Sequence, residues 1–219
     1  MTETPSRAGV IIAGGFSTRF QDGDKAVADL DGTPLIGHVA DRLEDVTDEL
    51  VVNCRAEQVD ALQDALETRS RTIQVAVDRT PDRGPLAGIA TGLEAASAPV
   101  AAVVACDMPF VETALLEALF ERLEGDGDRE TDEHEVRTAA VVPKHPDGWF
   151  QTTQAVYRTE PMANACRTAL EADEGKILAA LDRIEWTVLE PADWKRHATL
   201  GSFDSIDTRA DLEAARARF

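Results

Sequence analysis

The chain has 219 residues, of which 43% are hydrophobic and 29% are charged, a balance typical of a globular protein with a buried core. The length predicts one domain that spans 1–219. No apolar run approaches the roughly 18 residues of a membrane span, and the polar start does not resemble a signal peptide. We therefore expect a cytoplasmic protein without a membrane partner. The formal net charge of −19 repels polyanions and argues against a nucleic acid partner.

The basic residues are mostly arginine. Of the 22 basic residues 18 are arginines and only four are lysines, while acidic residues are spread along the whole chain. We interpret this pattern as a solvated acidic surface suited to high salt, where screening shortens the reach of self-repulsion.

Short apolar segments alternate with helix-forming segments in the first half of the chain. Strands are predicted at 9–13, 51–53, 73–77 and 100–105. Helices are predicted at 34–43, 57–66 and 86–96, followed by a helix with one apolar face over 115–123. Because the strands lack polar–apolar alternation, we expect helices on both faces of the sheet. The order of elements predicts an α/β fold with a predominantly parallel central sheet.

The second half begins with an acidic segment, 124–135, that has almost no apolar residue and is predicted to be an exposed loop. Further strands are predicted at 138–142 and 154–157, and further helices at 162–170 and 177–181. Thr208 and Asp211 have the spacing of a capping box, which predicts a last helix over 209–218.

Two glycines follow the first predicted strand directly. Gly14 and Gly15 have no Cβ to block a bulky anion, so backbone N–H groups can point into one concavity and hold phosphates. Arg19 can offer a planar fork to phosphate oxygens, and Lys25 a point charge. The alternative is a tight strand-to-helix turn with two solvated cations. Neither a P-loop nor a GxGxxG motif occurs, which removes the usual grounds for an ATPase or a dinucleotide dehydrogenase.

An aspartate stands where the strand at 100–105 ends. In open α/β sheets, ligands bind in a crevice at the carboxyl ends of the strands, which is where Asp107 is expected. Its carboxylate suits Mg²⁺, which also takes phosphate oxygens as ligands. The alternative is that Asp107 caps a helix or forms a turn ahead of Pro109. Cys106 beside it is interpreted as a small buried hydrophobic residue, because no histidine lies nearby in the sequence. The three cysteines fit neither a disulfide framework nor a zinc pattern, so reduced thiols are expected.

A third polar cluster follows the strand at 73–77. Gly84 and Pro85, with Gly88 further on, describe a loop that enters a helix whose N-terminus is open to a ligand. Asp78 at the strand end can accept hydrogen bonds from the N–H groups of a purine. The alternative is ordinary solvation of a loop aspartate.

The chain resembles the MobA-type molybdenum cofactor guanylyltransferases, which are members of the nucleoside-triphosphate transferases. The segments that carry the resemblance are AGGFSTR, DKA, TPL, VVN, RGPLAGI and ACDMPF. The resemblance is close over 9–110 and resumes at 155–158 and 205–212. It implies a three-layer, Rossmann-like nucleotidyltransferase fold. The opening loop alone indicates only a nucleotidyltransferase of some kind, whereas GPLAGI and CDMPF are more specific to this family.

The resemblance also implies roles for individual positions. Those implied to contact the nucleotide or its phosphates are Ile12, Ala13, Gly14, Gly15, Arg19, Lys25, Asn53, Asp78 and Asp107. Asp107 would also ligate Mg²⁺, and Arg19, Lys25 and Asp107 would act in catalysis. The chain departs from the family pattern at Phe20-Gln21, where members have Met-Gly. It departs again at Ser205 and Asp207, where members have asparagines, and Asp207 is a second candidate near the metal.

The activity implied by the resemblance is transfer of GMP from GTP to the terminal phosphate of molybdopterin, with Mg²⁺ as cofactor and pyrophosphate as leaving group. The expected partners are GTP, molybdopterin and, transiently, cofactor biosynthesis proteins or recipient apoenzymes. Pterin contacts are expected from 144–157. The alternatives are cytidylyl transfer to molybdopterin, guanylyl transfer to another phosphorylated precursor, or a non-catalytic GTP-binding delivery module. The presence of both Lys25 and Asp107 favours an enzyme.

Overall fold

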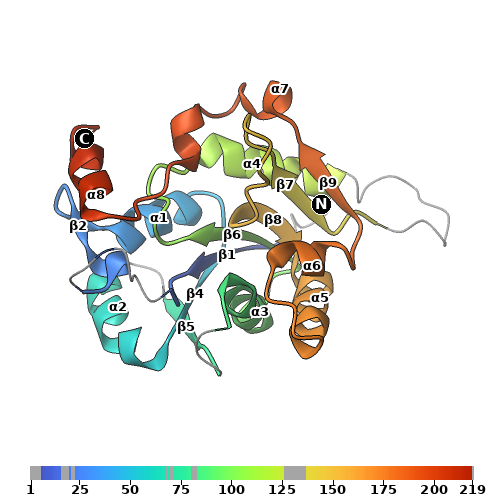
Figure 1. Ribbon diagram of the computed structural model, residues 1–219, viewed down its shortest axis with the longest axis horizontal. Helices are drawn as coiled ribbons and strands as arrows, with labels where there is room; N and C mark the ends of the chain where they lie inside the picture. Colours follow the sequence, from blue (N-terminus) through green and yellow to red (C-terminus); the bar gives the residue numbers. More distant parts are fainter. Residues whose placement is uncertain are drawn as a thin grey trace.

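A seven-stranded sheet runs through the centre of the computed structural model (Figure 1). The structure describes residues 6–15, 20, 23–67, 69, 72–79, 83–125 and 137–218. The strand order is β5-β4-β1-β6-β8-β7-β9. Only β8 runs antiparallel to its neighbours, so the sheet is predominantly parallel, as predicted. The strands are β1 (Arg7–Ile12), β4 (Glu49–Cys54), β5 (Ile73–Val77), β6 (Val100–Ala105), β7 (Ala140–Pro143), β8 (Gln154–Arg158) and β9 (Trp186–Leu189).

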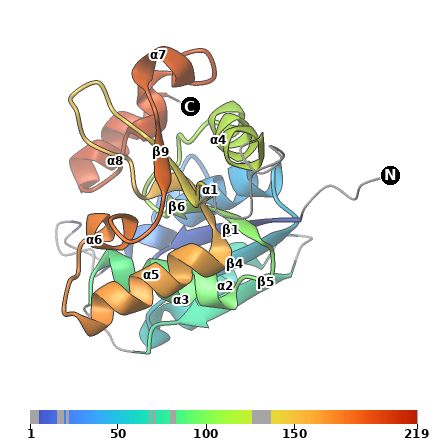
Figure 2. The same ribbon diagram turned by 90° about the vertical axis from the view of Figure 1, so that its right-hand side faces the viewer.

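Helices cover both faces of this sheet, which gives the predicted three layers (Figure 2). One face packs against α1 (Leu35–Glu44), α2 (Val59–Leu66) and α4 (Thr113–Gly125). The opposite face packs against α3 (Pro85–Ala95), α5 (Thr159–Glu171) and α6 (Ile177–Leu181). Because both faces are covered, the central strands β1 and β6 are buried along almost their whole length and do not alternate.

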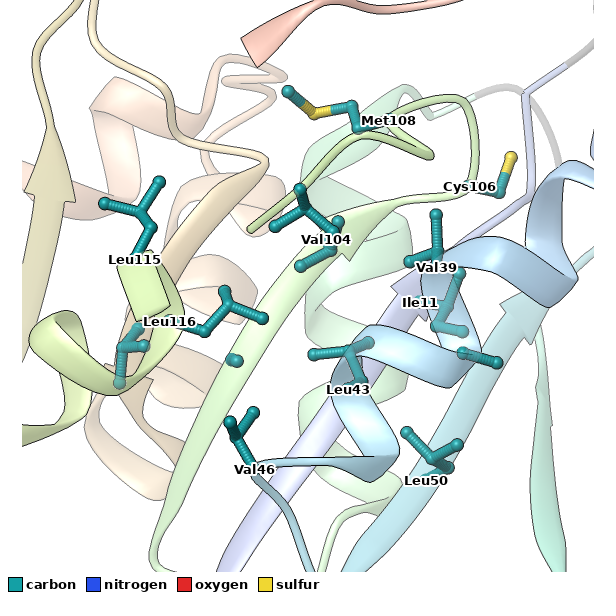
Figure 3. Close-up of a cluster of buried hydrophobic side chains, with 14 of the residues drawn as sticks. Ile11, Val39, Leu43, Val46, Leu50, Val104, Cys106, Met108, Leu115 and Leu116 are labelled. Atoms are coloured by element: carbon teal, nitrogen blue, oxygen red, sulfur yellow. The ribbon is translucent and has the colours of Figure 1, made fainter. Parts of the chain in front are cut away.

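The core on the α1 side shows this packing in detail. Ile11 and Val104 project from β1 and β6 toward Val39 and Leu43 on α1, and all four side chains are completely buried (Figure 3). Neighbouring strand residues face the other way, so Val10 packs on the α3 side. Each buried aliphatic side chain of this kind contributes about 1.5–3 kcal/mol to folding.

A small antiparallel hairpin and the last helix form a separate apolar cluster at the edge of the molecule. The hairpin consists of β2 (Asp29–Leu30) and β3 (Thr33–Pro34), and α8 (Arg209–Arg216) lies beside it (Figure 1). Their shared cluster is made by Phe20, Leu30, Leu35, Ile206, Leu212 and Ala215. The predicted capping box is confirmed, since Thr208 Oγ1 accepts from Asp211 N at 3.1 Å and Asp211 Oδ2 accepts from Thr208 N at 2.8 Å.

The predicted strands and helices are confirmed, with ends displaced by a few residues, and α8 ends two residues before the predicted 218. The hairpin, β9 and α7 (Pro191–Trp194) were not predicted. Glu124 and Gly125, assigned to an acidic loop, belong to α4 instead, because Glu124 pairs with Arg7 at 2.6 Å. Most of that segment lies outside the described residues. No helix in the described part of the chain is long and apolar enough to cross a membrane.

Candidate active site

A cavity of about 600 Å³ opens at the carboxyl ends of the parallel strands. The chain leaves β1 toward β4 on one side, while β6 pairs with β1 on the other, so strand order reverses at β1. Open α/β sheets bind ligands at such a reversal, where the loops on either side diverge. The cavity is lined from β1, β4, β5 and β6 by Ile12, Ala13, Gly14, Gly15, Asn53, Asp78, Ala105, Cys106, Asp107 and Met108. Other segments add Lys25, Arg83, Gly84, Pro85, Ala87, Gly88, Gln151, Thr153, Phe203, Ser205 and Asp207.

The two glycines after β1 both line the cavity, but the space beside each of them differs. A Cβ on Gly14 would lie 2.6 Å from Asp78 Oδ2, so any side chain would displace that carboxylate. A Cβ on Gly15 would meet nothing within 4 Å, which leaves the backbone open to an approaching ligand. The predicted phosphate loop is therefore bare at Gly15 and packed against an acidic side chain at Gly14.

Lys25 joins two carboxylates in the cavity wall. Its Nζ lies 2.6 Å from Asp107 Oδ2 and 3.0 Å from Asp207 Oδ1, and its side chain is only 14% exposed. Burial lowers the pKa of Lys25, but attraction and hydrogen bonding by Asp107, with a hydrogen bond to Asp207, outweigh it and raise the pKa above its ordinary value. Lys25 is therefore charged, and it is not the solvated cation of the alternative interpretation.

Main-chain hydrogen bonds bring the ends of the chain to this cluster. Cys106 N donates to Ile12 O at 3.0 Å, which extends the β1–β6 ladder to the edge of the cavity, and Ile206 N donates to Asp107 O at 2.8 Å. The second bond holds Asp207 beside Asp107. Helix α4 begins at Thr113, so Asp107 does not cap a helix, but it does lie in a turn ahead of Pro109, in which Met108 N donates to Ala105 O at 3.2 Å. Cys106 is buried, as predicted.

A hydrogen-bonded polar pair, Asn53 and Asp78, lines the cavity at the ends of β4 and β5. Asn53 Nδ2 donates to Asp78 Oδ1 at 2.7 Å and so orients the carboxylate. Asn53 Oδ1 is buried without a hydrogen-bond partner among the described residues and lies 2.5 Å from where a Cβ on Gly88 would be. The N-terminus of α3 faces the same space. Gly84 there has φ of +75°, a conformation that favours glycine, and Pro85 follows at the first helical position.

The residues expected to bind nucleotide are thus brought together from separate parts of the sequence. Ile12, Ala13, Gly14, Gly15, Lys25, Asn53, Asp78 and Asp107 all line one cavity. Arg19 lies outside the described residues. Gln151 and Thr153, within the segment 144–157 singled out in the sequence, also line the cavity, whereas Phe203 was not predicted because no motif marks it.

The carboxylates of Asp107 and Asp207 are the candidate metal ligands. No group of three or more metal-binding side chains occurs in the described ranges. Mg²⁺ does not need one, because it is held by one or two carboxylates together with water and substrate phosphates. Two carboxylates against one ammonium also leave an excess negative charge facing the cavity. The donor set therefore fits a hard divalent cation that arrives with a phosphorylated ligand.

A predominantly parallel sheet with such a cavity at its strand reversal defines an α/β protein built to bind a phosphorylated small molecule. Comparison with known families makes this more specific. The MobA-like NTP transferase domain matches residues 9–185, and the chain belongs to this family.

Relatives agree over almost the whole chain. A protein from Natronomonas pharaonis named "Probable molybdenum cofactor guanylyltransferase" is 50% identical over 212 residues, which are 97% of this chain and 98% of that protein. A "Molybdenum cofactor guanylyltransferase" of Burkholderia ambifaria is 34% identical, covering 80% of this chain and 82% of that protein.

Among solved structures, molybdopterin-guanine dinucleotide biosynthesis protein A from Archaeoglobus fulgidus superposes with a TM-score of 0.76 and 25% identity, covering 96% of this chain and 97% of that one. A nucleotidyl transferase from Methanothermobacter thermautotrophicus, at 18% identity and a TM-score of 0.69, shares the fold and covers 97% of both chains. The predicted Rossmann-like nucleotidyltransferase fold is confirmed.

Proposed function

We propose that this protein is a molybdenum cofactor guanylyltransferase, which transfers GMP from GTP to the terminal phosphate of molybdopterin and releases pyrophosphate. One observation carries the proposal. Lys25, Asp107 and the bare Gly15 backbone line the same cavity as Asn53 and Asp78, which supports a single site with the phosphates at the first group and the base at the second. The names of the relatives support the choice of substrates.

The base end favours guanine. Asp78 presents carboxylate oxygens to the cavity and is held in place by Asn53. Guanine offers two adjacent donors on one edge, N1–H and the exocyclic amino group, and a carboxylate can accept both. Adenine and cytosine offer one amino group next to an acceptor nitrogen, which a carboxylate repels. Asp78 therefore discriminates among bases by satisfying both donors of guanine.

The reaction requires no activated side chain. The terminal phosphate of molybdopterin, mostly dianionic at neutral pH because its second pKa is about 6, attacks the α-phosphorus of GTP. A bond forms from the attacking phosphate oxygen to the α-phosphorus, and the bond from the α-phosphorus to the bridging oxygen breaks. Pyrophosphate leaves with that electron pair. The barrier arises from bringing two anions together, so the protein must orient both and balance the charge.

The chain's own groups perform this work. Backbone N–H groups of the glycine loop and the ammonium of Lys25 bind the phosphates, and Arg19 belongs to the same proposed set. Asp107, with Asp207 beside it, would hold Mg²⁺. When bound there, the cation supplies positive charge for the phosphate oxygens and a template for their alignment.

The acceptor is proposed to lie beside Gln151 and Thr153. Both residues line the cavity and fall within 144–157, where pterin contacts are expected from the sequence. The amide of Gln151 and the hydroxyl of Thr153 can donate and accept the hydrogen bonds that a pterin ring requires. Transient contacts with cofactor biosynthesis proteins or recipient apoenzymes complete this proposal.

A cytoplasmic setting is part of the same proposal. Cys54, Cys106 and Cys166 are all free and buried, as expected for a compartment that keeps thiols reduced.

The test is pyrophosphate release by the purified protein supplied with Mg²⁺, GTP and molybdopterin. Thermal unfolding with GTP, CTP or ATP, each with Mg²⁺, identifies the base, because a nucleotide that binds the native state raises Tm. We expect GTP to give the largest shift and pyrophosphate release to require molybdopterin. A larger shift with CTP would overturn the guanine assignment. Binding of GTP without pyrophosphate release would instead identify a non-catalytic delivery module.

A further inference from the structure

Three successive carbonyl groups of the loop after β1 are held by one short segment that does not line the cavity. Arg55 Nη1 donates to Gly14 O at 2.7 Å and to Gly15 O at 2.5 Å. Gln58 Nε2 donates to Ala13 O at 2.9 Å. Both side chains come from the turn that follows β4, which contains the 3-10 helix η2 (Ala56–Gln58). We call Arg55 and Gln58 the clasp.

The clasp determines which way the loop's amide groups point. In a trans peptide the C=O of one residue and the N–H of the next are directed to opposite sides. Because the carbonyls of Ala13 and Gly14 are turned toward the clasp, the N–H groups of Gly14 and Gly15 are turned away from it. The glycines line the cavity and the clasp does not, so the loop lies between them. The clasp thus aims a row of donors at the cavity, an arrangement that favours an anion.

The same segment also reaches the residue that caps the turn of Lys25. Gln58 Nε2 donates to Asp24 Oδ2 at 2.5 Å, while Asp24 Oδ1 accepts from Ala26 N at 3.0 Å. Asp24 is the N-cap of the 3-10 helix η1 (Lys25–Val27). One amide side chain therefore connects the glycine loop to the backbone that carries Lys25.

The clasp acts through geometry more than through its charge. Arg55 is 9% exposed, and its Nε donates to Glu57 Oε1 at 2.7 Å, so a carboxylate already balances the guanidinium. Gln58 is neutral and 3% exposed, and its Oε1 accepts from Arg55 N at 2.9 Å. The two residues brace each other as well as the loop.

We propose that Arg55 and Gln58 are positioning residues for the phosphates of the nucleotide. They hold the glycine loop in the conformation that presents its N–H groups, and they link it to the turn of Lys25. This rests on the proposed function, in that the anion is taken to be the triphosphate of GTP. The base contacts the cavity elsewhere, at Asp78, so losing the clasp weakens binding of phosphates and leaves binding of the nucleoside intact.

The experiment compares Arg55→Met with a matched control, Arg69→Met. The side chains of Arg55 and Arg69 are both 10% exposed, and both pair with carboxylates. Arg69 also donates to a glycine carbonyl, Gly37 O at 2.6 Å, but that glycine is on α1 and Arg69 does not line the cavity. Binding of Mg²⁺·GTP, Mg²⁺·pyrophosphate and guanosine is measured by calorimetry. We expect Arg55→Met to weaken the two phosphate ligands about tenfold to a hundredfold and guanosine less than about twofold. Arg69→Met should lower Tm without changing any of the three affinities.

Arg55→Lys keeps the charge but loses the planar fork, so it should restore part of the pyrophosphate affinity. Should Arg55→Met fail to fold, Gln58→Met is the second variant, and it should show the same selective loss for phosphate ligands. Equal weakening of guanosine and pyrophosphate, or equal effects of Arg55→Met and Arg69→Met, would show that the clasp only supports the fold and overturn the inference.

The proposed function and the clasp fail in different ways. Wild-type protein that binds pyrophosphate but not GTP would refute the guanylyltransferase, while loss of that pyrophosphate binding in Arg55→Met would still support the clasp. Wild-type protein that binds GTP, with unchanged pyrophosphate affinity in Arg55→Met, would refute the clasp alone.

Discussion

Near each end of β1 one cation lies between two carboxylates, but the surroundings of the two clusters differ. At the start of the strand, Arg7 pairs with Glu117 at 2.8 Å and Glu124 at 2.6 Å, and its guanidinium lies 4.5 Å from the ring centroid of Phe120. After its end, Lys25 pairs with Asp107 and Asp207 at the cavity. The two clusters therefore have the same charges, but only the Lys25 cluster faces the cavity.

Arg7 illustrates a structural cluster. Its Nε, Nη1 and Nη2 all donate to glutamates of α4, which ties the first strand to that helix. Hydrogen bonding to Glu124 raises its pKa, against a smaller opposing effect of burial. Lys25 instead offers a point charge with rotatable donors in a cavity of about 600 Å³, where a ligand can replace its partners. Charge count alone does not identify a site; the neighbouring space and the strand ends do.

The largest difference is expected from removing one carboxylate of each cluster. Asp107→Asn should abolish Mg²⁺-dependent pyrophosphate release, because a neutral amide is a much poorer ligand for a hard cation. Glu117→Gln is the control from the Arg7 cluster and should keep full turnover. Circular dichroism should show that both variants retain the fold. Wild-type turnover in Asp107→Asn would mean that the metal is held elsewhere.

The cation of the cavity cluster should affect catalysis next most strongly. Lys25→Ala is expected to cost about 2–4 kcal/mol in kcat/KM, since it removes a preorganised charge next to the phosphates. Steady-state pyrophosphate release at fixed Mg²⁺ measures this. An unchanged kcat/KM would exclude Lys25 from the mechanism.

The cation of the structural cluster should affect stability instead. Arg7→Met removes hydrogen bonds to two carboxylates at a side chain that is 16% exposed, and is expected to lower the free energy of unfolding by about 2 kcal/mol. Urea denaturation measures the loss, and GTP affinity should stay at the wild-type value. A drop in GTP affinity with unchanged stability would reverse the roles assigned to the two clusters.

The same contrast explains what the sequence could predict. The strands and helices follow from short apolar segments that alternate with amphipathic ones, and the glycine loop, Lys25 and Asp107 follow from local motifs. The clasp could not be found in this way. Arg55 and Gln58 carry no motif, and their partners Gly14 and Ala13 lie more than 40 residues away along the chain. Likewise, the position of Asp207 beside Asp107 depends on a main-chain bond between distant segments.

Some expectations stay predictions. The adaptation of the acidic surface to high salt is one of them. The roles of Lys25 and Asp107 are tested by the two variants above, and the role of Arg19 stays a prediction from the sequence.

The smallest expected effect concerns a thiol near the acidic edge of the cavity. Burial raises the pKa of Cys54 to about 11, and the nearby carboxylates of Asp78 and Asp24 add to the rise. The unfolded chain loses the thiol proton near pH 9, so between pH 9 and 11 the native state binds more protons than the unfolded state. The free energy of unfolding must therefore fall as pH rises through this window.

Cys54→Ala removes this contribution. Compared with wild-type protein, the variant should lose about 1 kcal/mol less stability between pH 8 and pH 10, measured by urea denaturation under reducing conditions. Asp78→Asn should make the wild-type decline smaller and end it at a lower pH, because with less negative charge beside it the native thiol loses its proton more easily and its pKa moves toward the unfolded value. Since burial is the larger cause, most of the Cys54 contribution should persist in Asp78→Asn, whereas Cys54→Ala removes all of it. Equal declines in all three proteins would show that Cys54 does not sense the charge excess at the cavity.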